Sequence, residues 1–394
     1  MTAGMREEDN AAPLYRKMIG EFTATEDASA ALGFSGPMSD KDEKWDGGPW
    51  NPADHAAWEK SYARTKDLID DFLQASAKSH AFFGLSYDES TPEATRTLID
   101  VRVGPLSYFR ALAKGASDHA WRAPAGKVDG ERFVALMAAN AGLARQIDRE
   151  PMAISQLIGH ALRSLICDDF SLALDRDILT ATQRRKCLDI LRSPSFEPRP
   201  FRTVANAELA VFYDVTQMLA KRGPVRGAAM AAAPADPAAT CSSVAEFYKK
   251  LAARSEQPWT PSIGKDIEAL ENDLKAKRNE EIIKMLIPNL GRAIVLRFRS
   301  EALCRGTRLL YELSAFHDKN NAWPDSLDKL PGVPVAAKTD PFSGKPFIYR
   351  LAGDSFTLYS VGINTRDDGG KHDPKFGEKT GDGDYVFWPV QKDR

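Results

Sequence analysis

The residues best suited to chemistry lie near the C-terminus, in the long polar segment Gly362–Gly383. This segment carries several carboxylate and amide side chains, together with glycines that let a backbone bend around an ion. Strand-forming residues flank it on both sides, and a long polar loop between strands is usually functional or disordered. The arrangement predicts a small β-module closed by a cation. The alternative interpretation is a solvated acidic loop without metal.

Three predicted strands and one long helix must position this loop. The strands are Phe347–Leu351, Phe356–Val361 and Asp384–Trp388. The first two are joined by Ala352-Gly-Asp-Ser355, which is a hairpin signal. The helix spans roughly Glu280–Phe316, with a break predicted near Pro288 and Gly291. Because this helix is apolar on two sides, we expect it to lie between a helical body and the sheet.

The segment upstream, from about Ala53 to Ala220, has a helical pattern. Its clearest apolar face has a period near 3.6 and consists of Met152, Ile154, Leu157, Ile158, Ala161, Leu162, Leu165 and Ile166. Short connections between such helices imply antiparallel neighbours. The predicted fold class is therefore mostly α with a C-terminal α+β module. It consists of an antiparallel helical body followed by a long helix packed on a small antiparallel sheet.

Composition shifts divide the chain into five predicted parts. They are an irregular N-terminal segment (1–54), a helical domain (55–221), an Ala/Pro/Gly linker or loop (222–242), a helical continuation (243–294) and the α+β module (295–394). The linker is predicted because Gly, Pro and Ala occur there without large apolar residues.

Four motifs in the module occur in a characteristic order after the long helix. They are Trp323-Pro-Asp-Ser-Leu327, Asp340-Pro-Phe-Ser-Gly-Lys-Pro-Phe-Ile-Tyr349, Leu358-Tyr-Ser-Val-Gly362 and Gly383-Asp-Tyr-Val-Phe-Trp388. With these motifs, residues 295–390 resemble the globular domain of the major pseudopilin of type II secretion systems. More loosely, the whole chain resembles bacterial envelope proteins that carry such a tail on a helical body, a likeness that implies no known reaction.

The resemblance implies calcium, because the family binds this ion in the loop before its last strand. Calcium takes about six to eight oxygen ligands from carboxylates, amides and carbonyls. The matching candidates here are Asn364, Asp367, Asp368, Asp373, Asp382 and Asp384. By position, Asn364 replaces the first loop aspartate of the family, and Asp382 or Asp384 matches the late one. A neutral amide ligand lowers the expected affinity. The spacing is not that of an EF-hand.

One departure from the family bears on the role of the module. A pseudopilin begins with a leader and an apolar helix that stacks into a fibre, whereas here residues 1–294 precede the module. Arg292, Arg297, Arg299 and Glu301 interrupt any lipid-compatible stretch. We therefore expect a reused module and no assembly into a pseudopilus by the usual helix packing.

Charge and hydropathy exclude some partners. The formal net charge is −2, so no global field recruits nucleic acid. No window is apolar enough to predict a membrane-spanning segment. The first residues lack the apolar core of a signal peptide, which places the chain in the cytoplasm unless a signal was removed. If a signal was removed, an extracytoplasmic or envelope-associated location is expected.

Catalytic motifs are scarce. The chain has no P-loop, no Gly-x-Ser-x-Gly elbow and no Gly-x-Gly-x-x-Gly. His160 has the type of a general base, but a satisfied histidine at a helix boundary is more common. A Cys167–Cys187 bridge across a helical hairpin is conceivable in an oxidising compartment. These observations predict a non-enzymatic structural or interaction protein of the bacterial envelope, with protein partners and a calcium-stabilised pseudopilin-like module.

The alternative is a hydrolase with its site in the helical body. Carboxylates that act on glycosidic bonds carry no local sequence signature. Trp45 and Trp50 lie in a turn cluster and have the ring surface to stack on a sugar. The competing interpretation is a loop that pins two aromatic rings onto the following helix.

Overall fold

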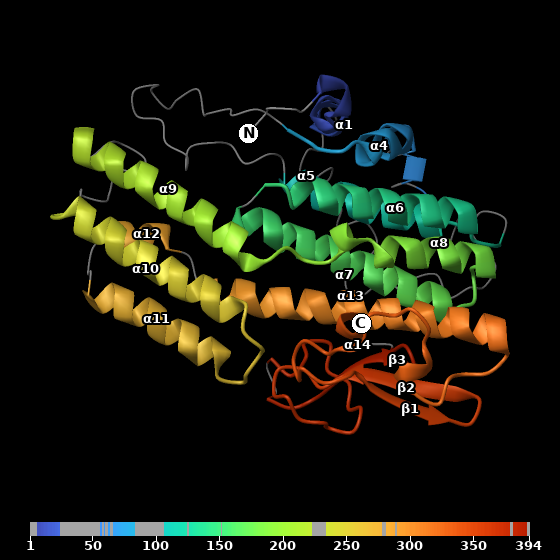
Figure 1. Cartoon of the computed structure of the whole chain (residues 1–394). Coiled ribbons are helices and arrows are strands. Elements are labelled where there is room, and N and C mark those ends of the chain that lie inside the picture. Colours follow the sequence, from blue (N-terminus) through green and yellow to red (C-terminus); the bar gives the residue numbers. More distant parts are fainter. Residues whose placement is uncertain are drawn as a thin grey trace.

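The computed structural model describes residues 6–23, 56, 59, 62–63, 66–82, 106–123, 126–150, 152–222, 234–277, 281–287, 290–378 and 381–391. Within these residues the chain is mostly helical, with a three-stranded sheet at its C-terminal end (Figure 1). The predicted fold class is confirmed. Trp45 and Trp50 lie outside the described residues.

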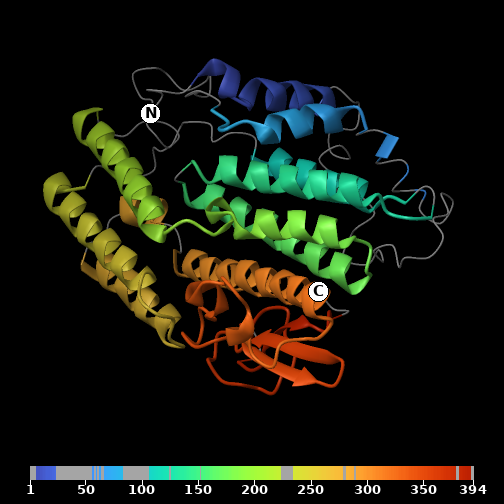
Figure 2. The ribbon, with the colours of Figure 1, turned by 45° about the vertical axis from the view of Figure 1, so that its right-hand side comes forward.

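The helical body is a stack of antiparallel layers. Its members are the short 3-10 helix η1 (Glu7–Asp9), α1 (Ala12–Thr23), α4 (Leu68–Ala77), α5 (Leu106–Trp121), α6 (Gly130–Ile147), α7 (Ala153–Asp175), α8 (Ala181–Arg192) and the short η4 (Pro194–Phe196). Figure 2 shows α1 and α4 covering α5 and α6, followed by α7 and α8 and then by the long α13.

Local sequence explains where two of these helices begin. The Asp129 side chain accepts hydrogen bonds from the backbone N–H groups of Glu131 and Arg132, which caps α6. Thr180 and Gln183 form a reciprocal capping box at the start of α8. In α7 the predicted apolar face is buried only at Leu162 and Ile166, whereas Ile154 and Ala161 of that face are exposed. Packing rather than intrinsic propensity holds such faces in place.

A second group of helices extends from one end of the body. It contains α9 (Phe201–Arg222), α10 (Pro237–Ser255), α11 (Ile263–Lys277) and α12 (Glu281–Leu286). The linker predicted over residues 222–242 is wrong for residues 237–242, which form the first turns of α10. Asp236 caps this helix by accepting from the N–H of Ala239 at 2.9 Å, and Pro237 occupies its first turn. Alanines after a capped proline favour helix despite the linker-like composition.

The long helix α13 (Leu290–Asn320) joins the body to the module. The predicted break near Pro288 is confirmed, since α12 ends at Leu286 and α13 begins at Leu290. One side of α13 packs on α7 and α8, and the other contacts α14, β2 and β3 (Figure 1). Leu309, Leu310 and Leu313 are all buried between these layers. The prediction that this helix packs on two sides is confirmed.

The sheet has the strand order β1-β2-β3 and is antiparallel throughout. Its strands are β1 (Ile348–Ala352), β2 (Ser355–Ser360) and β3 (Tyr385–Trp388), and the short helices η5 (Leu327–Lys329) and α14 (Val335–Lys338) precede them. The ring of Phe387 lies against Gly306 of α13, where a Cβ atom would meet the ring's Cζ at 2.2 Å. A glycine in the helix therefore lets the sheet approach closely.

Candidate functional site

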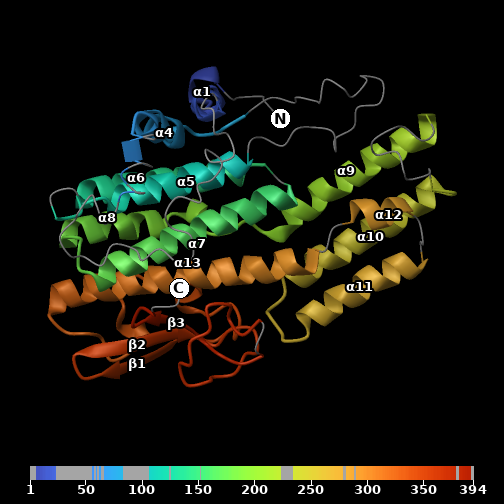
Figure 3. The same cartoon turned by 180° about the vertical axis from the view of Figure 1, so that it is seen from behind.

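The loop between β2 and β3 lies beside the sheet (Figure 3). It folds back onto the start of β3, where its backbone contacts Asp384. The side chain of this residue is 0% exposed. It accepts hydrogen bonds from the backbone N–H groups of Gly370 at 2.7 Å and Asp368 at 3.3 Å. The backbone of Asp384 also pairs with Lys371 and Asp373, at 2.7 and 2.8 Å. The middle of the loop is thus tied to the edge of the sheet.

A second carboxylate, that of Asp368, contacts the residue immediately before Asp384. One of its oxygens, Oδ2, accepts hydrogen bonds from Gly383 N–H at 2.7 Å and from Asn364 Nδ2 at 2.8 Å. The same Asn364 nitrogen lies 3.3 Å from the carbonyl oxygen of Gly381. The fold therefore brings Asn364 into contact with Asp368, and Asp368 into contact with Asp384.

The other three candidate ligands, Asp367, Asp382 and Asp373, form hydrogen bonds or ion pairs with other residues. Asp367 accepts from Tyr359 Oη at 2.8 Å and pairs with Arg350 at 2.7 Å. A second pair joins Asp382 to Lys371 Nζ at 2.8 Å. The third, Asp373, accepts from the N–H of Lys375 at 2.7 Å. Within the described residues, no three His, Cys, Asp or Glu side chains are grouped closely enough to hold a metal ion.

One of these carboxylates has a pKa above its ordinary value, mainly because it is buried. Burial raises the pKa of Asp384, the two backbone N–H groups partly offset this, and the charges of Asp368 and Asp367 raise it further. In contrast, hydrogen bonds from Gly383 and Asn364 lower the pKa of Asp368. A cation placed between Asp384 and Asp368 would relieve their mutual repulsion.

The oxygen atoms that lie here are of the kinds that bind a hard cation such as calcium. Asn364 Nδ2 bridges the Asp368 carboxylate and the Gly381 carbonyl, so two oxygens converge on one N–H donor group. A half-turn of the amide exchanges its oxygen and nitrogen. That rotation would place oxygens of Asn364, Asp368 and Gly381 near one another, but it would break the hydrogen bond that Asn364 Oδ1 accepts from Arg366 N–H at 2.8 Å. Carboxylate, amide and carbonyl oxygens are the ligands that calcium takes.

Asp340 organises the module but is absent from the predicted site. Its buried carboxylate accepts from Phe342 N–H at 3.0 Å, Ser360 Oγ at 3.0 Å and Val361 N–H at 3.1 Å. It thereby joins the turn before β1 to the end of β2, immediately before the acidic loop. One sequence feature could have pointed to this role of Asp340: it begins Asp340-Pro-Phe-Ser-Gly344, a sequence typical of a turn that starts with an aspartate.

We expect Asp340 to give the module a measurable pH dependence. Burial raises its pKa to about 6, although its hydrogen bonds act to lower it, against 3.8 for an exposed aspartate. The folded state therefore binds more protons than the unfolded state between these values. The free energy of unfolding should fall by about 2 kcal/mol as pH rises from 4 to 6. Urea denaturation of the wild type and Asp340→Asn across this range measures the contribution, because asparagine does not titrate. If the free energy of unfolding changed with pH in the same way in both proteins, Asp340 would make no such contribution.

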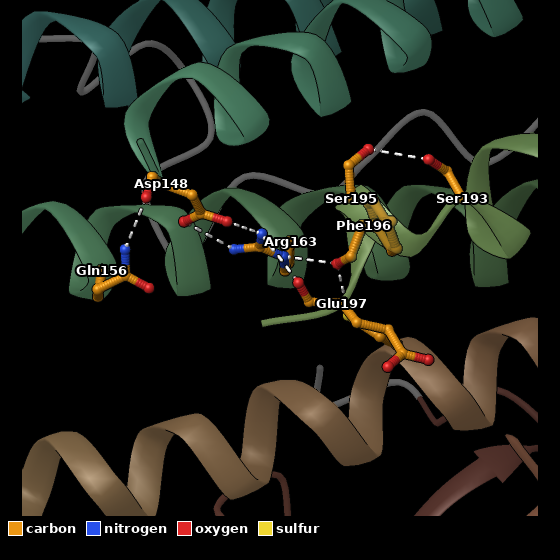
Figure 4. Close-up of polar contacts among 8 residues, drawn as sticks. Asp148, Gln156, Arg163, Ser193, Ser195, Phe196 and Glu197 are labelled. Atoms are coloured by element: carbon orange, nitrogen blue, oxygen red, sulfur yellow. Dashed lines mark hydrogen bonds and ion pairs between the residues drawn. The ribbon is translucent and has the colours of Figure 1, made fainter. Parts of the chain in front are cut away.

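In the helical body a buried ion pair joins Arg163 of α7 to Asp148, which follows α6 (Figure 4). Arg163 Nε also donates to the carbonyl of Phe196 at 2.6 Å, and the carbonyl of Asp148 accepts from Gln156 Nε2 at 3.3 Å. Gly159 leaves room for this pair, since a Cβ there would lie 2.4 Å from Asp148 Oδ1. The pair ties α6, α7 and the η4 turn together and has the character of a structural element.

Two further sequence hypotheses concern His160 and Cys167. His160 is buried, and its burial together with the positive charges of Arg163 and Arg297 lowers its pKa to about 3. Such a histidine stays neutral at physiological pH. The thiol of Cys167 hydrogen-bonds with Cys304 of α13, and Cys167, Cys187, Cys241 and Cys304 are all free cysteines. The structure thus contains no Cys167–Cys187 bridge.

Two cavities in the described part of the chain do not resemble a glycosidase site. One of about 350 Å³, between α4, α6 and α8, is lined mainly by alanines and serines together with Arg145. Another, of about 320 Å³, lies between α10 and α11 and includes Glu246 and Asp273. Each of these two carboxylates pairs with a lysine of its own helix. Neither cavity presents a pair of free carboxyl groups.

Comparisons with protein-family models, with curated proteins and with solved structures find no match. Among the helices described, none has the length and apolar character required to cross a membrane.

Proposed function

We propose that this chain is a non-enzymatic interaction protein of the bacterial envelope, with a pseudopilin-like C-terminal module stabilised by calcium. The observation that carries the proposal is the gathering of Asn364, Asp368 and Asp384 where the loop folds back on β3. The order of the module's motifs supports the likeness to a pseudopilin domain. The envelope location rests on that likeness.

An open sheet edge supports a role in protein binding. Strand β1 lies at the edge of the sheet and pairs with β2 alone among the described strands. Leu351, on this strand, is 44% exposed. Edge strands offer unpaired backbone groups to an extended segment of a partner. The proposed role of the calcium ion is to hold the loop, and with it the sheet, in one conformation.

Calorimetric titration of calcium into the EDTA-treated chain tests this proposal. We expect one binding event with a Kd between about 10 µM and 1 mM, because one ligand is a neutral amide. Asp384→Asn and Asp368→Asn should each weaken binding at least tenfold. Asp354→Asn changes an exposed aspartate in the β1–β2 turn and serves as the matched control. Circular dichroism in EDTA verifies that each variant keeps its helices.

Two outcomes would overturn the calcium site. One is the absence of binding heat in the wild type at millimolar calcium. The other is an equal loss of affinity in the control and the two loop variants, because that result would point to general surface charge.

A further inference from the structure

Two thiols meet where α7 packs on α13. Cys167 of α7 and Cys304 of α13 are both buried, and their side chains hydrogen-bond with each other. Figures 1 and 3 both show the two helices side by side. Both cysteines are free in the structure. Because they lie far apart in the sequence, it is the packing of the two helices that brings their sulfur atoms together.

Contacts in both directions along the helices fix them around this pair. One turn before the cysteine of α7, Arg163 Nε donates to the carbonyl of Phe196 at 2.6 Å, and Cys304 Sγ donates to the same carbonyl at 3.7 Å. On the other side of the pair, the carbonyl of Phe170 accepts from Tyr311 Oη of α13 at 3.0 Å, and the two rings lie 5.4 Å apart. Thiols in contact across two fixed helices meet the main geometric requirement of a disulfide, which is a short separation of the two residues.

The other two cysteines have different partners. The thiol of Cys187 hydrogen-bonds with a tyrosine of α13, and the thiol of Cys241 hydrogen-bonds with a threonine of α9. The pairing expected under oxidation is therefore Cys167 with Cys304. It differs from the Cys167–Cys187 bridge that spacing in the sequence makes conceivable.

We propose that Cys167 and Cys304 form a disulfide bond in an oxidising compartment, and that this bond fastens α13 to α7. The oxidant is a small disulfide such as oxidised glutathione. The thiolate of one cysteine attacks a sulfur of the small disulfide, which gives a mixed disulfide and releases one reduced thiol. The second thiolate attacks the protein sulfur of the mixed disulfide, closes the bond and releases the other reduced thiol. Two electrons pass to the oxidant, and the two protons of the cysteines end on the two released thiols.

Burial decides when the bond can form. It raises the pKa of the Cys167 thiol well above its ordinary value, and thiol–disulfide exchange needs a thiolate. Cys167 is 0% exposed and Cys304 is 3% exposed, so an oxidant cannot reach either sulfur once α13 covers α7. We therefore expect the bond to close while the chain folds. It is independent of the calcium loop.

Refolding of the full chain in a glutathione buffer tests the proposal. The chain is unfolded in urea, diluted into oxidised and reduced glutathione, and then alkylated with N-ethylmaleimide under denaturing conditions. Mass spectrometry should find two of the four cysteines alkylated and a cross-linked peptide pair that contains Cys167 and Cys304. The Tm should exceed that of the chain refolded with a reductant by about 5 °C. Cys304→Ala should leave all remaining cysteines alkylated, whereas the matched control Cys241→Ala should keep the bond.

Three results would overturn the proposal. One is alkylation of all four cysteines in the refolded wild type. Another is a bridge through Cys187 or Cys241. The third is a Cys167–Cys304 bond that leaves Tm unchanged, because such a bond would not fasten the two helices.

Discussion

Replacing Arg163 by methionine should lower the free energy of unfolding by about 3–5 kcal/mol. The guanidinium is fully buried and pairs with Asp148, while its Nε satisfies the carbonyl of Phe196 (Figure 4). Methionine keeps most of the volume but leaves a buried carboxylate without its cation. The Phe196 carbonyl would lose its donor as well, which adds a desolvation penalty. Urea denaturation followed by circular dichroism measures the change.

Two variants separate the loss of charge pairing from the loss of packing. Adding Asp148→Asn to Arg163→Met removes the unpaired charge, so the double variant should be more stable than the single one by at least about 1 kcal/mol. Arg202→Met removes an arginine from an exposed ion pair and should leave the urea midpoint almost unchanged. If Arg163→Met and Arg202→Met behaved alike, the buried pair would have no special structural role.

The second large effect is expected at the contact between α13 and the sheet. Gly306→Ala should destabilise the chain by about 2 kcal/mol, even though alanine normally favours a helix. The new Cβ would lie 2.2 Å from Phe387 Cζ and 2.3 Å from its Cε1. The ring is 0% exposed and is held edge-on by Phe347 and Tyr385, so it cannot move aside. The sheet would have to shift away from the helix.

The same substitution at Gly264 is the matched control. This glycine is exposed near the start of α11, and a Cβ there meets nothing within 4 Å. Gly264→Ala should therefore stabilise by up to about 0.5 kcal/mol through helix propensity. Phe387→Leu should partly rescue Gly306→Ala by making room for the new methyl group. Equal effects of the two glycine substitutions would show that the sheet does not press on α13.

Hydrophobic periodicity and turn residues made much of the fold predictable. The helix over Met152–Ile166, the break near Pro288 and the hairpin at Ala352–Ser355 each have a strong local signal. Residues 237–242 were misjudged because alanines beside prolines fit both a linker and a helix start. The deciding feature is Asp236, whose side chain caps α10.

The candidate calcium site was less predictable, because its geometry depends on contacts between residues that lie far apart in the sequence. Asp367 and Asp384 look equivalent as ligands along the chain, but Arg350 of β1 and Tyr359 of β2 engage the first. Asp340 acquires its role only where the turn before β1 meets the end of β2.

A crystal structure grown in millimolar calcium tests the central claim most directly. We predict an ion in the loop after Gly362, bound by oxygens of Asn364, Asp368 and Asp384 at about 2.3–2.6 Å, with carbonyl or water oxygens completing the shell. Its density should disappear after EDTA treatment. A loop without an ion, in which Asp384 still accepts from Gly370 and Asn364 still donates to Asp368, would contradict the account.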